Sequence, residues 1–189
     1  MQISTFAAIE IGSYSVNMEI FELSRKYGIR SIDQVRHRME LGKDSYGTGR
    51  IGKKLVRELC LVLKDFCGIM EGYQVKGYRA CATSTLQEAR NVWIVLDQVY
   101  QKTGINVEIL SNSEQRFYGY KSLAAKEAAF TKIIQKGTAI IEIGGGNVQI
   151  SLFDKDALVT TQNFKMGSLR IRERLIPVEK ETVYYEHLV

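Results

Sequence analysis

A short pattern that occurs twice, 132 residues apart, constrains what this chain can fold into more than any other feature. Residues 7–22 read AAIEIGSYSVNMEIFE, and residues 139–154 read AIIEIGGGNVQISLFD. Seven of the sixteen aligned positions are identical, where average residue usage predicts about one. The spacing is far too long for a solenoid repeat, so the pattern indicates a duplicated domain.

Each copy has the local pattern of a β-hairpin with a tight glycine turn. An apolar run ends near an acid, Glu10 or Glu142, and small residues then lead into an alternating strand. Glycine lets backbone N–H groups converge on an anion, so each turn is a candidate phosphate cradle beside a carboxylate that could hold a metal. The cradle residues are Gly12, Ser13 and Ser15 in the first copy, and Gly144, Gly145, Gly146 and Asn147 in the second. For one copy alone, the favoured interpretation is a plain hairpin turn without a binding role. Two matched copies instead favour a cleft lined by both turns.

The other segments alternate between strand and helix patterns. We expect strands over residues 29–41, 78–83, 105–110 and 157–165, helices over 53–72, 85–102 and 111–129 and from 168, and a glycine-rich loop over 43–52. Pro177 is expected to interrupt the last helix, with another short helix over 179–188. Three antiparallel strands followed by alternating helices and strands predict an α/β mixed sheet, in the ribonuclease-H-like order of actin-like ATPases.

Composition and charge exclude several classes of protein. The chain is 45% hydrophobic and 25% charged with one proline, which indicates a globular rather than a disordered or collagen-like protein. It shows no apolar run of the roughly 20 residues that span a bilayer, no signal-peptide pattern and no CxxC pair, so we expect a cytoplasmic protein with reduced thiols. Residues 25–57 hold ten Lys/Arg and three acids, a local charge of +7. This charge favours anionic partners such as phosphates, and nucleic acid is the weaker candidate because no nucleic-acid-binding signature is present.

Six phrases occur in a fixed order along the chain: IEIGSYS (9–15), YGTGRI (46–51), ATSTLQEARN (82–91), ILSNSEQ (109–115), IEIGGGNVQI (141–150) and MGSLRIRERL (166–175). Together they resemble the exopolyphosphatase/guanosine pentaphosphate phosphohydrolase family (Ppx/GppA phosphatases). The resemblance implies an actin-like fold with two ribonuclease-H-like domains. It also implies a bacterial hydrolase that uses Mg²⁺ to remove terminal phosphates from inorganic polyphosphate, or the 5′-phosphate from pppGpp, with a homodimer as the expected assembly.

The resemblance assigns roles by position. Glu114 falls on the catalytic glutamate that activates water, and Glu10 and Glu142 fall on aspartates that hold the metal. The two glycine turns line the phosphate path, and Arg90 falls on a basic residue near the substrate phosphates. Glu114 is also the last residue of an S-x-x-E capping box, and Arg90 could be an ordinary helix-surface arginine, so each has a structural alternative.

The chain departs from the family pattern around the metal. Both aspartates are glutamates, and Gln149 stands where the family has a metal-associated glutamate, which removes a charge that favours Mg²⁺. Tyr14 replaces asparagine, and Asn112 replaces glycine ahead of the catalytic position. These departures keep two alternatives open: a non-catalytic relative that binds polyphosphate or (p)ppGpp, and an actin-like ATPase or kinase of another branch.

The offset of the repeat also predicts the domain organisation. The first copy has about 130 residues, whereas the second has far fewer in which to form the same fold. We therefore expect one complete mixed-sheet domain over residues 1–130 and the start of a duplicated domain over residues 131–189. The chain is accordingly expected to be one piece of a longer protein.

Overall fold

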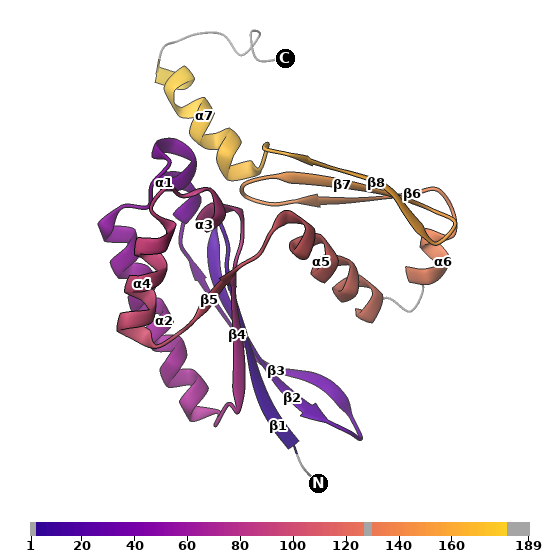
Figure 1. Cartoon of the computed structure of the whole chain (residues 1–189), viewed down its shortest axis with the longest axis horizontal. Helices are drawn as coiled ribbons and strands as arrows, with labels where there is room; N and C mark the ends of the chain where they lie inside the picture. The colour runs from indigo at the N-terminus through magenta and orange to yellow at the C-terminus, as the bar shows by residue number, and fades with distance from the viewer. Residues whose placement is uncertain (1–2, 127–129, 181–189) are drawn as a thin grey trace. The chain divides into compact units, whose positions relative to one another are not determined.

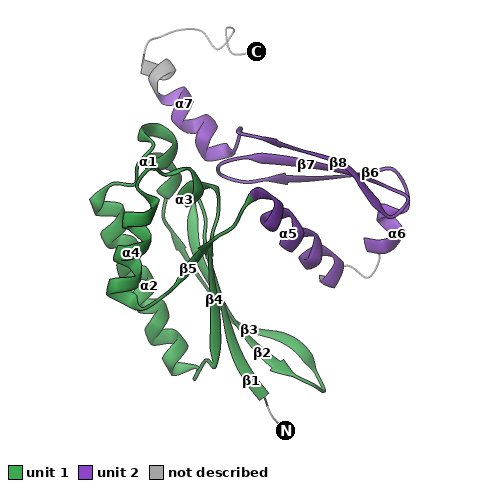
Figure 2. Cartoon of the chain, viewed as in Figure 1, with its two compact units in different colours: residues 1–111 green, residues 112–189 purple. Residues whose placement is uncertain are grey.

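The computed structural model of the chain describes residues 3–126 and 130–180 (Figure 1). They divide into two compact units, Met1–Ser111 and Asn112–Val189 (Figure 2). Each unit has its own β-sheet.

The first unit is built on a five-stranded mixed sheet in the order β3-β2-β1-β4-β5. Its strands are β1 (Ile3–Ile11), β2 (Ser15–Ser24), β3 (Gly28–Arg38), β4 (Gly77–Ala82) and β5 (Val107–Ile109). The first three strands are antiparallel, and β4 and β5 continue the sheet in parallel with β1. Its helices are α1 (Leu41–Thr48), α2 (Lys53–Gly72), α3 (Ser84–Glu88) and α4 (Val92–Thr103).

Alternation in β1 and β2 places one apolar face of this sheet in the core, where it packs with the apolar stripes of α2 and α4. The strand residues on this face are Ala7, Ile9, Ile11, Val16, Met18 and Ile20, all buried. The period of 3.6 in α2 contributes Leu59, Leu63 and Phe66 to the same core.

The second unit repeats the first three strands as a three-stranded antiparallel sheet in the order β6-β7-β8. Its elements are α5 (Asn112–Lys126), α6 (Phe130–Ile134), β6 (Thr138–Ile143), β7 (Val148–Asp154), β8 (Ala157–Phe164) and α7 (Ser168–Lys180). The repeat keeps its register: Glu10 pairs with Asn17 across the first hairpin, as Glu142 pairs with Gln149 across the second.

Among the described residues, one face of the second sheet packs against α5 and the other face is exposed. On one face, the hydroxyl of Tyr120 on α5 donates to Ser151, and its ring meets Phe153 edge-on with 5.1 Å between centroids. On the other face, Ile141 and Ile143 are 58% and 73% exposed. The equivalent Ile9 and Ile11 in the first unit are at most 2% exposed. The apolar face that α2 and α4 cover in the first unit is therefore open in the second, among the residues that the structure describes.

Most expected strands and α2 are confirmed, but three local expectations are wrong. Residues 41–48 form α1 rather than a loop, and Gly49 ends this helix with φ of +74°. The helix expected over 85–102 is two helices separated at Ala89–Asn91. Proline does not end α7, which continues through Pro177 to Lys180, and residues 181–188 of the final expected helix lie outside the described residues.

The compact units divide between Ser111 and Asn112, whereas the expected domains divide between residues 130 and 131, which stays a prediction. The units divide there because α5 packs on β7 through Tyr120 and so groups with the second sheet. Within the described residues, no helix combines the length and the apolar character needed to cross a membrane.

Candidate functional site

The first glycine turn is held from behind by backbone hydrogen bonds. The N–H of Gly12 donates to the carbonyl of Ser15 at 3.0 Å and closes the turn. The carbonyl of Ser13 accepts from the N–H of Gly42 at 2.9 Å, and that of Tyr14 accepts from Met39 at 3.0 Å. Carbonyl oxygens repel anions, but the carbonyls of Ser13 and Tyr14 already accept hydrogen bonds from the residues that lead into α1. The turn is therefore suited to present N–H groups to an anion.

Four hydroxyl groups meet directly behind this turn, and we call them the hydroxyl cluster: Ser13, Tyr46, Ser84 and Thr85. The Oγ of Ser13 lies 2.6 Å from the phenol oxygen of Tyr46 and accepts from Thr85 Oγ1 at 2.6 Å. Tyr46 also contacts Thr85 at 3.0 Å and Ser84 at 3.1 Å. The predicted cradle residue Ser13 thus directs its hydroxyl into the protein, while its backbone stays in the turn.

The second glycine turn repeats this construction with a different helix. The N–H of Gly144 donates to the carbonyl of Asn147 at 2.9 Å, matching Gly12 and Ser15. Behind the turn, Ser168 and Leu169 at the start of α7 donate to the carbonyls of Gly144 and Gly145, both at 3.0 Å. In the part of the chain that the structure describes, the N–H groups of Gly145 and Gly146 have no hydrogen-bond partner.

The side chain of Arg170 and the backbone of Gly167 complete the support of the second turn. Arg170 is buried, and its Nε donates to the carbonyl of Gly146 at 2.8 Å. A Cβ at Gly167 would lie 2.3 Å from the backbone carbon of Gly145 and 2.4 Å from the nitrogen of Asn147. Only glycine fits at position 167 without moving the turn.

Each hairpin carries its acid beside an amide from the opposite strand. Asn17 donates to Glu10 at 3.3 Å in the first copy, where Glu10 is exposed. Gln149 donates to Glu142 at 2.8 Å in the second. Burial raises the pKa of Glu142, and the hydrogen bond from Gln149 opposes that rise.

The carboxylate of Glu142 also lies against α5. A Cβ at Gly119 would be 2.8 Å from Oε1 of Glu142, so the close approach depends on this glycine. The predicted catalytic residue Glu114 is exposed in the first turn of the same helix. It precedes Gly119 by five residues, about 7.5 Å along the helix axis.

Arg90 lies against the end of α1. Its Nη2 donates to the carbonyl of Thr48 at 2.8 Å, and a Cβ at Gly49 would lie 2.6 Å from the same nitrogen. The neighbouring Asn91 clamps the backbone of Ile51, accepting from its N–H at 3.0 Å and donating to its carbonyl at 2.9 Å. These contacts give the ATSTLQEARN phrase a structural role, joining the end of α1 to the turn between α3 and α4.

Sequence reasoning missed the residues that support the turns. Tyr46, Thr85, Gly119 and Gly167 all lie against a predicted site residue, although the sequence analysis gave none of them a role in the site. The available signals were the density of hydroxyls in residues 82–86 and the glycine before the last helix.

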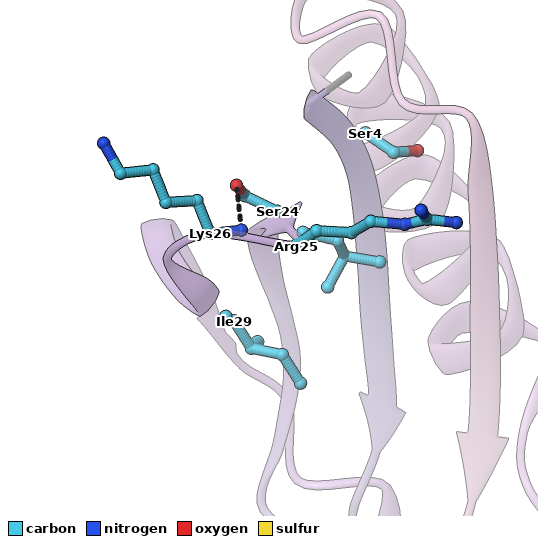
Figure 3. Close-up of a pocket in the computed structure, with 7 residues that line it drawn as sticks. Ser4, Ser24, Arg25, Lys26 and Ile29 are labelled. Atoms are coloured by element: carbon cyan, nitrogen blue, oxygen red, sulfur yellow. Dashed lines mark hydrogen bonds between the residues drawn. The ribbon is translucent and has the colours of Figure 1, made fainter. Parts of the chain in front are cut away.

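A separate pocket lies at the other end of the β2–β3 hairpin (Figure 3). Its lining includes Ser24 and Lys26, whose N–H donates to Ser24 Oγ at 3.2 Å. Ser24 pairs with Gly28 at the hairpin tip, whereas Ser15 beside the glycine turn pairs with Arg38 at the opposite end. This pocket is therefore not part of the turn site.

The two acids differ in their suitability for Mg²⁺, which takes one or two carboxylates together with waters and other oxygens. Glu10 is exposed, and the buried Oδ1 of its neighbour Asn17 lacks a partner among the described residues, so this pair offers hard oxygen ligands. Oε2 of Glu142 already accepts a hydrogen bond from Gln149, and Oε1 faces Gly119 on α5, where a side chain would have no room. No group of three His, Cys, Asp or Glu side chains suited to a metal occurs in residues 3–126 and 130–180.

The mixed sheet, the repeated hairpin and the paired glycine turns define an α/β protein of the actin-like ATPase fold, as the sequence predicted. The chain belongs to the Ppx/GppA phosphatase family, whose sequence model matches residues 20–184.

Three relatives illustrate this similarity. A bifunctional 3-dehydroquinate synthase/phosphatase of Fusobacterium nucleatum is 22% identical over 186 residues, which are 95% of this chain and 28% of that protein. Exopolyphosphatase 1 of Mycobacterium tuberculosis is 20% identical over 178 residues, 89% of this chain and 48% of that protein. The solved PPX-GPPA enzyme of Aquifex aeolicus superposes with a TM-score of 0.74 at 22% identity, covering 92% of this chain and 56% of that one. The chain thus spans about half or less of the curated relatives that it matches.

Proposed function

We propose that this chain carries the phosphate-binding turns of a phosphohydrolase that cleaves terminal phosphoanhydride bonds of inorganic polyphosphate, with pppGpp as the second candidate substrate. The observation that carries this proposal is the repeated construction of the turns. In both copies, N–H groups at or just before the start of a helix hold the turn carbonyls. Phosphoryl transfer depends mainly on such positioning and on charge neutralisation.

In this proposal, Glu114 is the catalytic residue that orients or deprotonates the attacking water. The turns 12–15 and 144–147 bind phosphate through backbone N–H groups, and Arg90 adds positive charge. Glu10 with Asn17, and Glu142 with Gln149, are the proposed Mg²⁺ ligands. A bound Mg²⁺ would supply neutralisation of charge on the phosphate oxygens. A homodimer and a cytoplasmic location belong to the same proposal.

Phosphate release tests this function directly. The chain is incubated with long-chain polyphosphate and Mg²⁺, and orthophosphate is measured for the wild type, Glu114→Gln and the surface control Glu71→Gln. We expect release by the wild type and the control, and its loss in Glu114→Gln. Release that persists in Glu114→Gln removes this residue from the mechanism, and release from pppGpp alone reassigns the substrate.

One observation favours a second candidate, a non-catalytic binder of polyphosphate or (p)ppGpp. Each hairpin acid is paired with a neutral amide rather than with another acid, and this arrangement lowers the negative charge available to Mg²⁺. Binding of tripolyphosphate by calorimetry, without any phosphate release, would support this candidate. Activity gained in Gln149→Glu would show that the amide is what prevents hydrolysis.

A further inference from the structure

We propose that Tyr46 is a positioning residue for the first phosphate turn, holding it ready for ligand through the hydroxyl cluster. The proposal rests on the proposed function in so far as the turn binds phosphate. Tyr46 lies on α1, and its phenol oxygen contacts Ser13 in the turn and both Ser84 and Thr85 on α3. One side chain therefore joins three segments that lie far apart in the sequence.

The hydroxyls of the cluster lie within hydrogen-bond distance of one another. Thr85 donates to Ser13, and Ser13 and Tyr46 lie within hydrogen-bond distance of further cluster oxygens. Ser13, Ser84 and Thr85 are each at most 7% exposed. A buried hydroxyl that loses its partner has no water to replace it, so the cluster favours one position of the turn.

Two further hydrogen bonds join α1 to the turn and to α3. Gly42 on α1 donates to the carbonyl of Ser13, and Ser45 beside Tyr46 donates from Oγ to the carbonyl of Thr85 at 2.8 Å. Tyr46 thus fixes the side chain of Ser13, while Gly42 fixes its carbonyl. Loss of the phenol would loosen the turn without removing any group that the proposal brings into contact with phosphate.

The test uses the full chain and Tyr46→Phe, which keeps the ring and removes the hydroxyl. Thr85→Val serves as a second variant that removes another member of the cluster. Tyr78→Phe is the matched control, since its phenol contacts Gly104 and Asn106 rather than the turn. Amide hydrogen exchange is followed at Gly12, Met39 and Gly42, whose N–H groups hold the turn, and at Gly144 in the second copy as an internal reference.

We expect exchange at Gly12, Met39 and Gly42 to be about fivefold faster in Tyr46→Phe and Thr85→Val, the change that corresponds to one lost hydrogen bond. Exchange at Gly144 should not change in any variant, and exchange at Gly12, Met39 and Gly42 should not change in Tyr78→Phe. The dissociation constant of inorganic tripolyphosphate should rise by about the same factor in the two cluster variants. Unchanged exchange at the turn, or a uniform increase across the first unit, would overturn the proposal. If the wild type binds no tripolyphosphate, the proposed function fails, while the exchange comparison still decides whether Tyr46 positions the turn.

Discussion

Gln149 donates a hydrogen bond from Nε2 to Oε2 of Glu142 at 2.8 Å, directly across the second hairpin. The equivalent pair in the first hairpin, Asn17 and Glu10, makes the same contact at 3.3 Å. The duplication has therefore conserved an acid–amide pair as well as a backbone turn. Only the second pair is enclosed, because α5 approaches Glu142 through Gly119.

The substitution Gln149→Glu would place a second carboxylate against Glu142. We expect the free energy of unfolding without Mg²⁺ to fall by about 1–3 kcal/mol, because a half-buried acid loses its donor and gains a like charge. Mg²⁺ should restore part of this loss. Urea denaturation with and without Mg²⁺ measures both effects. Asn17→Asp is the matched control beside the exposed Glu10 and should have the smaller effect; equal effects would contradict the prediction.

The raised pKa of Glu142 predicts a pH dependence of stability. Burial disfavours the charged form, so the folded state binds the proton more tightly than the unfolded chain does. The stabilisation that comes from protonated Glu142 is complete below the ordinary carboxyl pKa. It is lost as the pH rises through the raised pKa of Glu142 in the folded state. The Tm of the wild type should therefore fall relative to Glu142→Gln as the pH rises above the ordinary glutamate pKa of about 4.3. Thermal melts of both proteins and of Glu10→Gln measure this; parallel curves would argue against it.

Gly167→Ala should strongly destabilise the second unit. The new Cβ would lie 2.3–2.4 Å from the backbone of Gly145 and Asn147, and backbone cannot move aside as a flexible side chain does. We expect a loss above about 4 kcal/mol, in the range of severe overpacking and strain. Gly68→Ala in α2 is the control, because nothing lies within 4 Å of its Cβ position. It should gain about 0.5–1 kcal/mol from helix propensity.

The two copies supply a matched pair of core substitutions. Ile11→Ala removes a side chain that is fully buried and should lower the free energy of unfolding by about 2–5 kcal/mol. Ile143→Ala changes the equivalent residue, which is 73% exposed, and should fall within about 0.5 kcal/mol of the wild type. Denaturant unfolding of both variants tests the difference. A large loss in Ile143→Ala would mean that another chain covers this face in solution.

The sequence predicted the parts of the fold that depend on local patterns. Alternating apolar residues located both hairpins, and a period of 3.6 located α2. The structure adds that Glu142 pairs with Gln149 as Glu10 pairs with Asn17, so the two hairpins share one register. The family resemblance was carried by the same hairpins and by the phrases between them.

The supporting contacts could not be predicted because they join distant segments. Thr85 stands at the start of the helix expected over 85–102, yet its hydroxyl donates to Ser13, 72 positions away, and α3 has no side-chain cap hydrogen bond. The break at Ala89–Asn91 is likewise made by tertiary contacts, since Arg90 and Asn91 bond the backbone at Thr48 and Ile51. Local propensity carries no information about such partners.

The open face of the second sheet determines how this chain responds to heat. Strand β6 pairs only with β7 in the described residues, whereas its counterpart β1 pairs on both sides. An unpaired strand edge beside exposed Ile141 and Ile143 is a template on which partly unfolded molecules join one another. Heating should therefore end in irreversible association, and the apparent Tm should rise with scan rate. The time for which the heated chain stays folded would then be set by its rate of unfolding rather than by its equilibrium free energy of unfolding.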